Sequence, residues 1–345
     1  MKALRWHARR DVRYEEVADA PRPGPGNVRI RVAWAGICGT DVEEYVAGPL
    51  YIPVDTPHPL TGAMAPLVLG HEFSGIVESV GEGVTTLRVG DHVAADALIY
   101  CGKCAACRRQ SYNLCEKLAA LGQMADGGLA ELVTGPASTF VKIANSVPLD
   151  CAALSEPLAV AVRAVRRGEI EPGMSVIITG AGPIGLLALQ VARVFGAKVV
   201  VVVEPREDRR KLAVELGASA GYPSANGLDN FDVAIECTGV GAAQNGALAA
   251  VRPRGRLVLV GIPTAPSAWN SWEIVNGEKE VIGSLSHLVR EDFEVAVDLL
   301  ANNRVNVAPL ISRRVPLSEG PEVFRRLAQG ETHWIKILMN PGHES

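Results

Sequence analysis

The chain of 345 residues is 48% hydrophobic and 21% charged, with a formal net charge of -4. This length allows two packed domains, and this share of apolar residues excludes a disordered chain. The small negative charge argues against nucleic acid or an anionic membrane surface as a partner, because both require clustered Lys and Arg. The first residues contain no apolar stretch of signal-peptide length, so we expect a cytoplasmic protein.

The first predicted domain covers residues 1–152. Its candidate strands are short and interrupted by Gly or Pro, as in VRIRVAWAGI at 28–37 and ELVTGPASTFVKIA at 131–144. This pattern is typical of a mainly antiparallel unit with long loops.

Two short motifs in this domain combine into a candidate catalytic metal site. Cys38 lies in the Gly-flanked motif GICGTD at 36–41, and His71 and Glu72 lie in GHEFSG at 70–75. Thiolate, imidazole and carboxylate from separate segments are typical of an open zinc site, which leaves one position for water or substrate. A lone Cys is usually a small hydrophobe and a lone His a satisfied core residue, so the prediction depends on their joint presence.

Four of the seven cysteines lie close together, in CGKCAACRRQSYNLC at 101–115. Cytosolic thiols stay reduced, which favours metal ligands over disulfides. The spacing C-x2-C-x2-C-x7-C lets one loop wrap four thiolates around a single Zn²⁺. An iron–sulfur cluster and a redox pair are the alternatives. The spacing predicts a closed, structural zinc site formed by Cys101, Cys104, Cys107 and Cys115.

The second predicted domain, residues 153–289, alternates strands and helices, which is typical of a parallel doubly wound sheet. Residues 175–192 carry no charge over eighteen positions, as a membrane span would. Three glycines and a proline within them favour a strand, a turn and a helix instead. The alternation ends near residue 290, so we expect residues 290–345 to return to the first domain.

The turn after the first strand of this domain has the sequence GAGPIG. Its residues are Gly180, Ala181, Gly182, Pro183, Ile184 and Gly185. A G-x-G-x-x-G turn between a strand and a helix predicts a dinucleotide site, because backbone N–H groups and the helix N-terminus can hold a pyrophosphate.

The next strand ends in Glu204, where a carboxylate can accept hydrogen bonds from both hydroxyls of the adenosine ribose. A 2′-phosphate would meet this negative charge, so the sequence favours NAD over NADP. Arg206, Arg209 and Arg210 follow and keep NADP as an alternative, although they also fit a solvated helix face. We count Arg209 with the Gly-rich turn and Glu204 among the expected cofactor-binding residues.

The four-cysteine loop, the signature GHE-x2-G-x5-G-x2-V at 70–84 and the GAGPIG turn together resemble the zinc-dependent medium-chain dehydrogenases over essentially the whole chain. Within this family, the stretch 36–75, with YNLCEKLAALG and EPLAVAVRAV, is most similar to (R,R)-2,3-butanediol dehydrogenases, near relatives of the sorbitol dehydrogenases. The resemblance implies an α/β protein with a GroES-like, mainly antiparallel β catalytic domain at 1–152 and 290–345. Residues 153–289 would form a Rossmann domain that binds NAD.

The resemblance also implies roles for single residues. Cys38 and His71 would ligate a catalytic zinc, and Glu72 would do so directly or by exchange. Glu156 would complete the ligand set directly or through water, although a glutamate before proline can also cap the following helix. Thr40 would pass the substrate proton toward solvent.

One position departs from the family pattern. The family often has a histidine five residues after the zinc cysteine, at the outer end of the proton relay, whereas this chain has Glu43. The reference pKa of Glu is about 4.3 and that of His about 6.5. We therefore expect a pH profile different from that of the family.

The resemblance finally implies two Zn²⁺ per chain, one catalytic and one structural, and hydride transfer between NAD and a small secondary alcohol or vicinal diol. The expected pair is 2,3-butanediol and acetoin, with sorbitol-like polyols and threonine as alternatives. The non-enzymatic alternative is an NAD(H)-sensing or structural protein of the same fold. Relatives are dimers or tetramers, so we expect a homodimer or homotetramer. Tyr51, Asp55 and His58 could line a polar substrate pocket or satisfy one another.

Overall fold

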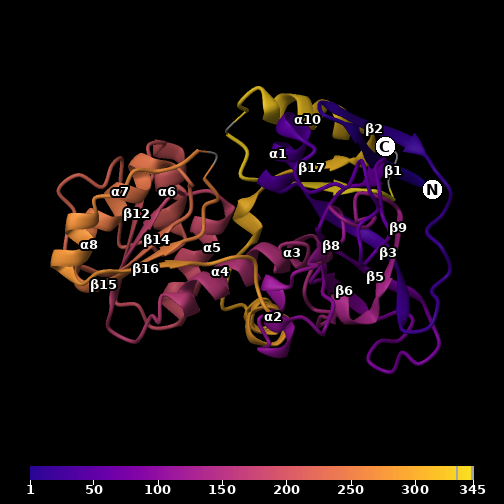
Figure 1. Ribbon diagram of the computed structural model, residues 1–345, viewed down its shortest axis with the longest axis horizontal. Coiled ribbons are helices and arrows are strands. Elements are labelled where there is room, and N and C mark those ends of the chain that lie inside the picture. Colours follow the sequence, from indigo (N-terminus) through magenta and orange to yellow (C-terminus); the bar gives the residue numbers. More distant parts are fainter. Residues whose placement is uncertain (264, 332, 343–345) are drawn as a thin grey trace. The chain divides into compact units, whose positions relative to one another are not determined.

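The computed structural model describes residues 1–263, 265–331 and 333–342 (Figure 1). It divides into two compact units. The first contains Met1–Glu156, Leu300–Asn302 and the chain from Val307 onward. The second contains Pro157–Leu299 and Asn303–Asn306.

The first unit is built around a seven-stranded sheet with the order β10-β6-β5-β3-β18-β17, in which β9 also pairs with β3. All of these pairings are antiparallel except that of β17 with β18. The smaller sheets have the orders β2-β1-β4 and β7-β8. The strands are β1 (Lys2–Ala8), β2 (Asp11–Glu16), β3 (Asn27–Gly36), β4 (Leu67–Val68), β5 (Glu72–Val80), β6 (His92–Ala95), β7 (Leu98–Ile99), β8 (Ala119–Ala120), β9 (Leu132–Pro136), β10 (Phe140–Lys142), β17 (Ile311–Pro316) and β18 (Lys336–Asn340).

Short helices connect these strands. They are α1 (Gly39–Ala47), α2 (Ala105–Arg108), α3 (Leu149–Ala152) and α10 (Gly320–Ala328), with single 3-10 turns at η1 (Tyr112–Leu114), η2 (Ala137–Thr139), η4 (Ala308–Leu310) and η5 (Leu317–Glu319). Alternating apolar residues of β3, such as Val28, Ile30 and Val32, pack with Phe73 and Val77 of β5 in the core of this unit. The alternation arises because successive strand residues face opposite sides of the sheet.

The second unit contains a six-stranded sheet with the order β13-β12-β11-β14-β15-β16. Every pairing in it is parallel. Its strands are β11 (Ser175–Thr179), β12 (Val199–Val203), β13 (Ala220–Tyr222), β14 (Phe231–Glu236), β15 (Val251–Leu259) and β16 (Glu280–Gly283). The order runs outward from β11 in both directions, as in a doubly wound sheet. The predicted fold class is therefore confirmed.

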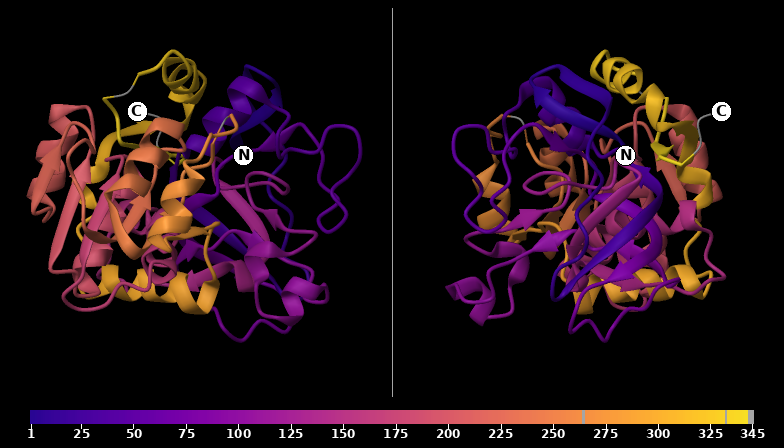
Figure 2. Two further views of the ribbon diagram at one scale, coloured as in Figure 1. Left: turned by 60° about the vertical axis from the view of Figure 1, so that its left-hand side comes forward. Right: turned by 90° about the vertical axis from the view of Figure 1, so that its right-hand side faces the viewer.

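Helices pack against this sheet (Figure 2). They are α4 (Ser155–Arg167), α5 (Pro183–Val194), α6 (Glu207–Glu215), α7 (Gly241–Ala250), α8 (Ser271–Gly277) and α9 (Glu294–Ala301), with a π-helical turn η3 (Val289–Phe293). The uncharged stretch 175–192 forms β11, the Gly-rich turn and most of α5. Among the described residues, helices with the length and apolar character of a membrane span are absent.

The chain enters the second unit at Pro157 and leaves it at Leu299, whereas the sequence placed these boundaries at 153 and 289. Residues 290–299 stay in the second unit because Phe293 is buried and Asp292 pairs with Arg163 of α4 at 3.1 Å. Asn306 also belongs there, because its backbone N–H donates to Gln190 of α5 at 2.7 Å and its carbonyl accepts from that side chain at 3.1 Å.

Candidate functional site

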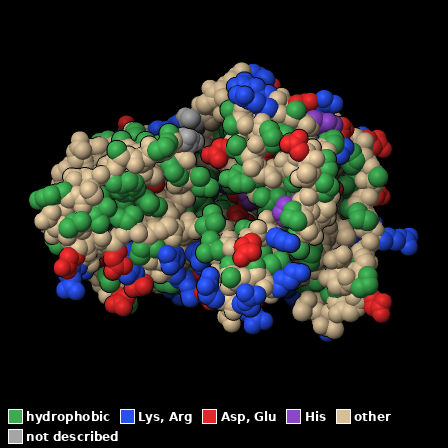
Figure 3. Space-filling view, in the orientation of Figure 1, with side chains coloured by type: hydrophobic (Ala, Val, Ile, Leu, Met, Phe, Trp, Pro, Cys, Tyr) green, Lys and Arg blue, Asp and Glu red, His purple; other side chains and the backbone are tan. Residues whose placement is uncertain are grey.

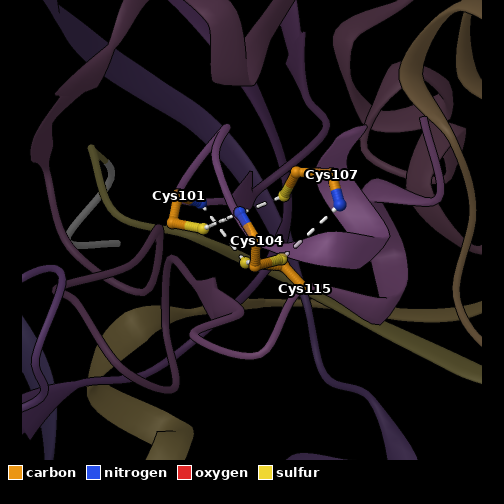
Figure 4. Close-up of side chains that lie close together, drawn as sticks. All are labelled: Cys101, Cys104, Cys107 and Cys115. Carbon is orange, nitrogen blue, oxygen red and sulfur yellow. Dashed lines mark hydrogen bonds between the residues drawn. The ribbon is translucent and has the colours of Figure 1, made fainter. Parts of the chain in front are cut away.

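The four cysteines of the loop 101–115 converge on one point (Figure 4). Their sulfur atoms all lie within 4.8 Å of one another. The Sγ atoms of Cys101 and Cys107 lie 3.9 Å apart, as do those of Cys104 and Cys115. Tetrahedral Zn–S bonds of about 2.3 Å place sulfurs about 3.8 Å apart. The loop therefore fits one Zn²⁺ with four thiolate ligands.

Backbone N–H groups surround these sulfurs. The N–H of Cys104 donates to the sulfur of Cys101 at 3.4 Å, and that of Cys107 donates to the sulfur of Cys104 at 3.5 Å. Hydrogen bonds from the N–H groups of Cys107 and Glu116 lower the pKa of Cys104 to about 6. Such donors stabilise the thiolate, which is the form that binds metal.

A second cluster joins Cys38, His71 and Glu72, whose ligand atoms lie within 4.8 Å of one another. Their convergence follows from the register of the large sheet, in which Gly36 at the end of β3 pairs with Glu72 at the start of β5. Cys38 comes two residues after Gly36 and is the N-cap residue of α1. Thiolate, imidazole and carboxylate together form the donor set expected for a catalytic zinc.

Asp41 orients two members of this cluster. Its Oδ2 accepts a hydrogen bond from the backbone N–H of Cys38 at 2.9 Å, and its Oδ1 lies 3.4 Å from Nδ1 of His71. Nδ1 therefore faces a carboxylate, and Nε2 is the ring nitrogen available to a metal. Burial would lower the pKa of His71, but the negative charges of Asp41 and Cys38 outweigh it and raise that pKa well above its ordinary value.

Glu72 is paired with a buried lysine from the far end of the chain. Nζ of Lys336, the first residue of β18, lies 2.8 Å from Oε1 and 2.5 Å from Oε2 of Glu72, and it donates to the carbonyl of Ile37 at 3.1 Å. The side chains of Lys336 and Glu72 are only 3% and 2% exposed. Burial would lower the pKa of Lys336, but the charges of Glu72 and Cys38 outweigh it and raise that pKa.

Asp41 and Lys336 are absent from the sequence-based site. A sequence pattern could have identified Asp41, because an acid three residues after an N-cap position completes a capping box. No sequence pattern points to Lys336, because only the pairing of β18 with β3 brings it near Cys38.

Two further predicted catalytic residues, Thr40 and Glu156, differ in their relation to this cluster. Oγ1 of Thr40 lies 3.7 Å from Sγ of Cys38. Glu156 lies in the first turn of α4 and outside the group of three close ligands that the described residues form. Its negative charge contributes to raising the pKa of Lys336.

The loop after α1 contributes one residue to the surroundings of Cys38. Burial raises the pKa of Tyr51, and the charges of Glu43, Glu44 and Cys38 raise it further. Both carboxylate oxygens of Glu44 fix this loop, accepting from the N–H groups of Leu50 at 2.9 Å and Tyr51 at 2.8 Å. Farther along the loop, Asp55 is exposed, and Nδ1 of His58 accepts from the N–H of Leu60 at 3.3 Å.

The Gly-rich turn has the form that the sequence predicted. Gly180 has φ of 94°, and a Cβ built on it would lie 2.7 Å from the methyl of Thr238. Gly182 is the N-cap of α5, and a Cβ on it would meet nothing within 4 Å, so its backbone is open to a ligand. Glu204 is buried, and its Oε2 accepts from the N–H of Ala181 in this turn at 2.9 Å.

The arginines after Glu204 have partners within the protein. Arg206 forms two hydrogen bonds with Asp208, at 3.1 and 2.7 Å. Nη1 of Arg210 donates to the carbonyls of Glu204 and Pro205, at 2.7 and 2.6 Å. Arg209 is half-buried, and burial lowers its pKa.

Comparisons with known proteins identify the family of this chain. The models of the alcohol dehydrogenase GroES-like domain and of the zinc-binding dehydrogenases match residues 24–145 and 183–302. The (R,R)-butanediol dehydrogenase of Neisseria gonorrhoeae is 36% identical over 99% of both chains. The crystal structure of 2R,3R-butanediol dehydrogenase from Bacillus subtilis has a TM-score of 0.90 at 35% identity and 99% coverage of both chains. The chain therefore belongs to the zinc-dependent medium-chain dehydrogenases, oxidoreductases that act on CH–OH groups.

Other relatives widen the range of substrates and cofactors. They include an L-threonine 3-dehydrogenase of Pyrococcus furiosus and a sorbitol dehydrogenase of Halalkalibacterium halodurans. A zinc-binding dehydrogenase from Sinorhizobium meliloti, bound to NADP, has a TM-score of 0.90 at 31% identity, with 99% of both chains covered. The predicted resemblance to this family is therefore confirmed. Family membership does not identify the substrate, because these relatives are named for different substrates.

Proposed function

We propose that the protein transfers a hydride between NAD and a small secondary alcohol with a neighbouring oxygen, with 2,3-butanediol and acetoin as the substrate pair. The observation that carries this proposal is the convergence of Cys38, His71 and Glu72 beside Thr40. The full-length similarity to butanediol dehydrogenases supports the choice of a vicinal diol. Polyols and threonine are the alternative substrates, and a comparison of kcat/KM across these substrates separates them.

The residues of the cluster have distinct roles in this proposal. Cys38 and His71 would hold the catalytic Zn²⁺, with Glu156 or Glu72 completing the ligand set directly or through water. Zn²⁺ bound there supplies Lewis-acid stabilisation of negative charge on the substrate oxygen. Asp41 fixes the orientation of Cys38 and His71 before substrate arrives.

The protein's own hydroxyl and carboxylate would move the proton. Thr40 lies beside Cys38, where it can accept the proton of the substrate hydroxyl and pass its own onward. Glu43, three residues after Thr40 on α1, would receive that proton at the solvent side. The four-cysteine loop would hold a second zinc, whose closed ligand set leaves no position for substrate.

Glu43 gives this proposal a distinctive pH dependence. Burial raises the pKa of Glu43, so its carboxylate becomes protonated at a higher pH than an exposed glutamate does. Diol oxidation should therefore decline on the acidic side as Glu43 loses its capacity to accept a proton. We expect Glu43→Gln to lower kcat by about tenfold and to flatten this acidic decline.

Initial rates across the acidic and neutral range test this role, and added imidazole should partly restore the Glu43→Gln variant. Glu82→Gln is the matched control, because Glu82 is an exposed acid in the same unit. A Glu43→Gln variant with the rate and pH profile of the parent would remove Glu43 from the relay.

We propose NAD as the cofactor, because Glu204 would face a 2′-phosphate. Its carboxylate is buried at the Gly-rich turn. Arg206 and Arg210 are engaged with Asp208 and with backbone carbonyls, which reduces their ability to receive a phosphate. The Gly-rich turn would receive the pyrophosphate through Gly180, Gly182, Pro183, Ile184 and Gly185. Arg209 would lie beside the adenosine end of the cofactor.

Glu204→Ser should weaken NAD⁺ and reduce its preference over NADP⁺. A charge-assisted hydrogen bond contributes about 1.5 to 3 kcal/mol, so we expect KM for NAD⁺ to rise roughly tenfold or more. Measuring kcat/KM for both cofactors tests this, with Glu207→Ser as the control, since Glu207 pairs with Lys211 on the exposed side of α6. An unchanged preference in Glu204→Ser would assign the ribose contact to another residue.

We also infer a cytoplasmic location, self-association as a homodimer or homotetramer, and no nucleic-acid partner. All seven cysteines are free, as in a reducing compartment. An exposed apolar surface supports self-association. Trp272 and Val275 of α8 are 69% and 73% exposed, and Figure 3 shows apolar side chains gathered over this part of the second unit.

The charge distribution argues against a nucleic-acid partner, because acidic side chains lie among the basic ones in Figure 3.

A further inference from the structure

The second unit contains a buried acid, Glu236, at the end of β14. Its side chain is fully buried, and in the parallel sheet it is the register partner of Thr179, the last residue of β11. The order of the strands reverses between β11 and β14. Doubly wound sheets bind dinucleotides at the carboxyl ends of their strands, at such a reversal. Glu236 therefore lies where the sheet is expected to bind its cofactor.

Within the described part of the chain, the partners of this carboxylate come from the turn that follows it. Its Oε1 accepts from the N–H of Thr238 at 2.6 Å, from the hydroxyl of Thr238 and from the N–H of Gly239 at 3.2 Å. Its Oε2 accepts from the same N–H of Gly239 at 3.2 Å. Successive N–H groups of a turn can form a concavity that binds an anion, and Gly239 has the positive φ, 70°, that such a turn uses. The carboxylate thus holds the turn from inside.

This turn packs directly on the Gly-rich turn. A Cβ built on Gly180 would lie 2.7 Å from the methyl of Thr238, so the two turns touch through a glycine. On the other side, a Cβ built on Gly261 would lie 2.0 Å from the backbone nitrogen of Gly239. The loops after β11, β14 and β15 are therefore in close contact, and a shift of the middle loop would reach the Gly-rich turn.

We propose that Glu236 is a positioning residue for the cofactor, whose carboxylate holds Thr238 against Gly180 and so keeps the Gly-rich turn in the shape that receives the pyrophosphate. This inference rests on the proposed function, because it assumes that NAD binds at the Gly-rich turn. Without the carboxylate, the N–H groups of Thr238 and Gly239 lose their acceptor, and the turn can move away from Gly180. Since Glu236 contacts the turn and is itself buried, its loss should weaken cofactor binding more than it slows hydride transfer.

The test measures the dissociation constants of NADH, from its fluorescence, and of NAD⁺, by calorimetry, for variants of the full chain. We expect Glu236→Ala to raise both constants by about tenfold, while kcat at saturating NAD⁺ stays within about threefold of the parent's. Glu236→Gln should change both constants by no more than about twofold, because its amide oxygen can still accept from both groups of Thr238 and from Gly239.

Glu236→Asp tests the inference even if Glu236→Ala does not fold. It keeps the negative charge but is one methylene shorter, which withdraws the carboxylate from the turn. We expect it to raise both constants by about fivefold. If Glu236→Asp bound NADH as the parent does while Glu236→Gln bound it weakly, the charge and not the position of the turn would matter, and the inference would be overturned.

Asp232→Ala is the matched control, since Asp232 lies near the amino end of the same strand and pairs with Arg252 at 2.8 Å. It should lower the unfolding temperature and leave both dissociation constants unchanged. A folded Glu236→Ala variant with the parent's constants would overturn the inference, as would an equal loss of affinity in Asp232→Ala, which would indicate a merely structural role. Failure of the proposed function looks different, because the parent itself would then fail to bind NADH.

Discussion

Cys104→Ser is expected to lower the unfolding temperature by more than roughly 10 °C and to leave one zinc per chain. Zinc binding contributes on the order of 10 kcal/mol in small structural sites, against a total stability of about 5 to 15 kcal/mol for a typical domain. The loop 101–115 would depend on this metal, because only Cys107, Asn113 and Cys115 among its residues are buried. Molecules of the variant that do fold should retain diol oxidation, since this zinc lies outside the reaction.

Thermal unfolding and zinc content measure the effect of Cys104→Ser. Cys151→Ser is the matched control, because Cys151 is a partly buried cysteine of the same unit and belongs to neither cluster. We expect the control to keep both zincs and nearly the parent's unfolding temperature. A Cys104→Ser protein with parental stability and two zincs would contradict the structural role of the loop.

His71→Ala is expected to abolish most activity while the structural zinc remains. The variant would lose one proposed ligand of the catalytic metal, and Lewis-acid stabilisation is worth several kcal/mol, so kcat/KM should fall by about a thousandfold or more. The variant should bind about one zinc less per chain than its parent, and the carboxylate of Asp41 loses its buried partner. Initial rates and metal analysis on the same sample test this prediction.

The control for His71→Ala is His7→Ala, because His7 contacts Glu15 at 3.0 Å in the same unit but belongs to neither metal cluster. This control should keep two zincs and the parent's kcat/KM. A His71→Ala variant with substantial activity would place the reaction at a different site.

The two metal clusters differ in how far the sequence alone could predict them. The four cysteines of the proposed structural site lie within one loop, so their spacing is enough to predict a common metal. Cys38 and His71 come from separate segments, and only the register of β3 with β5 brings them together. Sequence patterns do not encode that register, so the prediction of this site depended on the joint presence of two motifs and on the family resemblance.

The partners of the ligands were harder to predict than the ligands. Asp41 follows an N-cap residue, where an acid commonly has only a capping role. Lys336 opens the strand KILMN, and a lysine at a strand end is normally exposed to solvent. Its burial depends on pairing with Glu72, a contact across 264 positions of the chain.

The second domain boundary illustrates a similar limit. Local patterns in residues 290–299 show that the strand–helix alternation has ended, but they do not show where these residues pack. The ion pair of Arg163 with Asp292 keeps this segment in the second unit, and such a tertiary contact leaves no periodic signal in the sequence.

The most direct test of the proposed function is a comparison of kcat/KM, with NAD⁺, for (R,R)-, meso- and (S,S)-2,3-butanediol, 2-butanol, sorbitol and threonine under one set of conditions. The neighbouring oxygen should orient the substrate at the metal or hydrogen-bond to a nearby carboxylate such as Glu156. 2-Butanol lacks this oxygen, so losing about 1.5 to 3 kcal/mol should reduce its kcat/KM by a factor of about ten to a hundred relative to (R,R)-2,3-butanediol. If sorbitol or threonine were the best substrate instead, the assignment to butanediol would be contradicted.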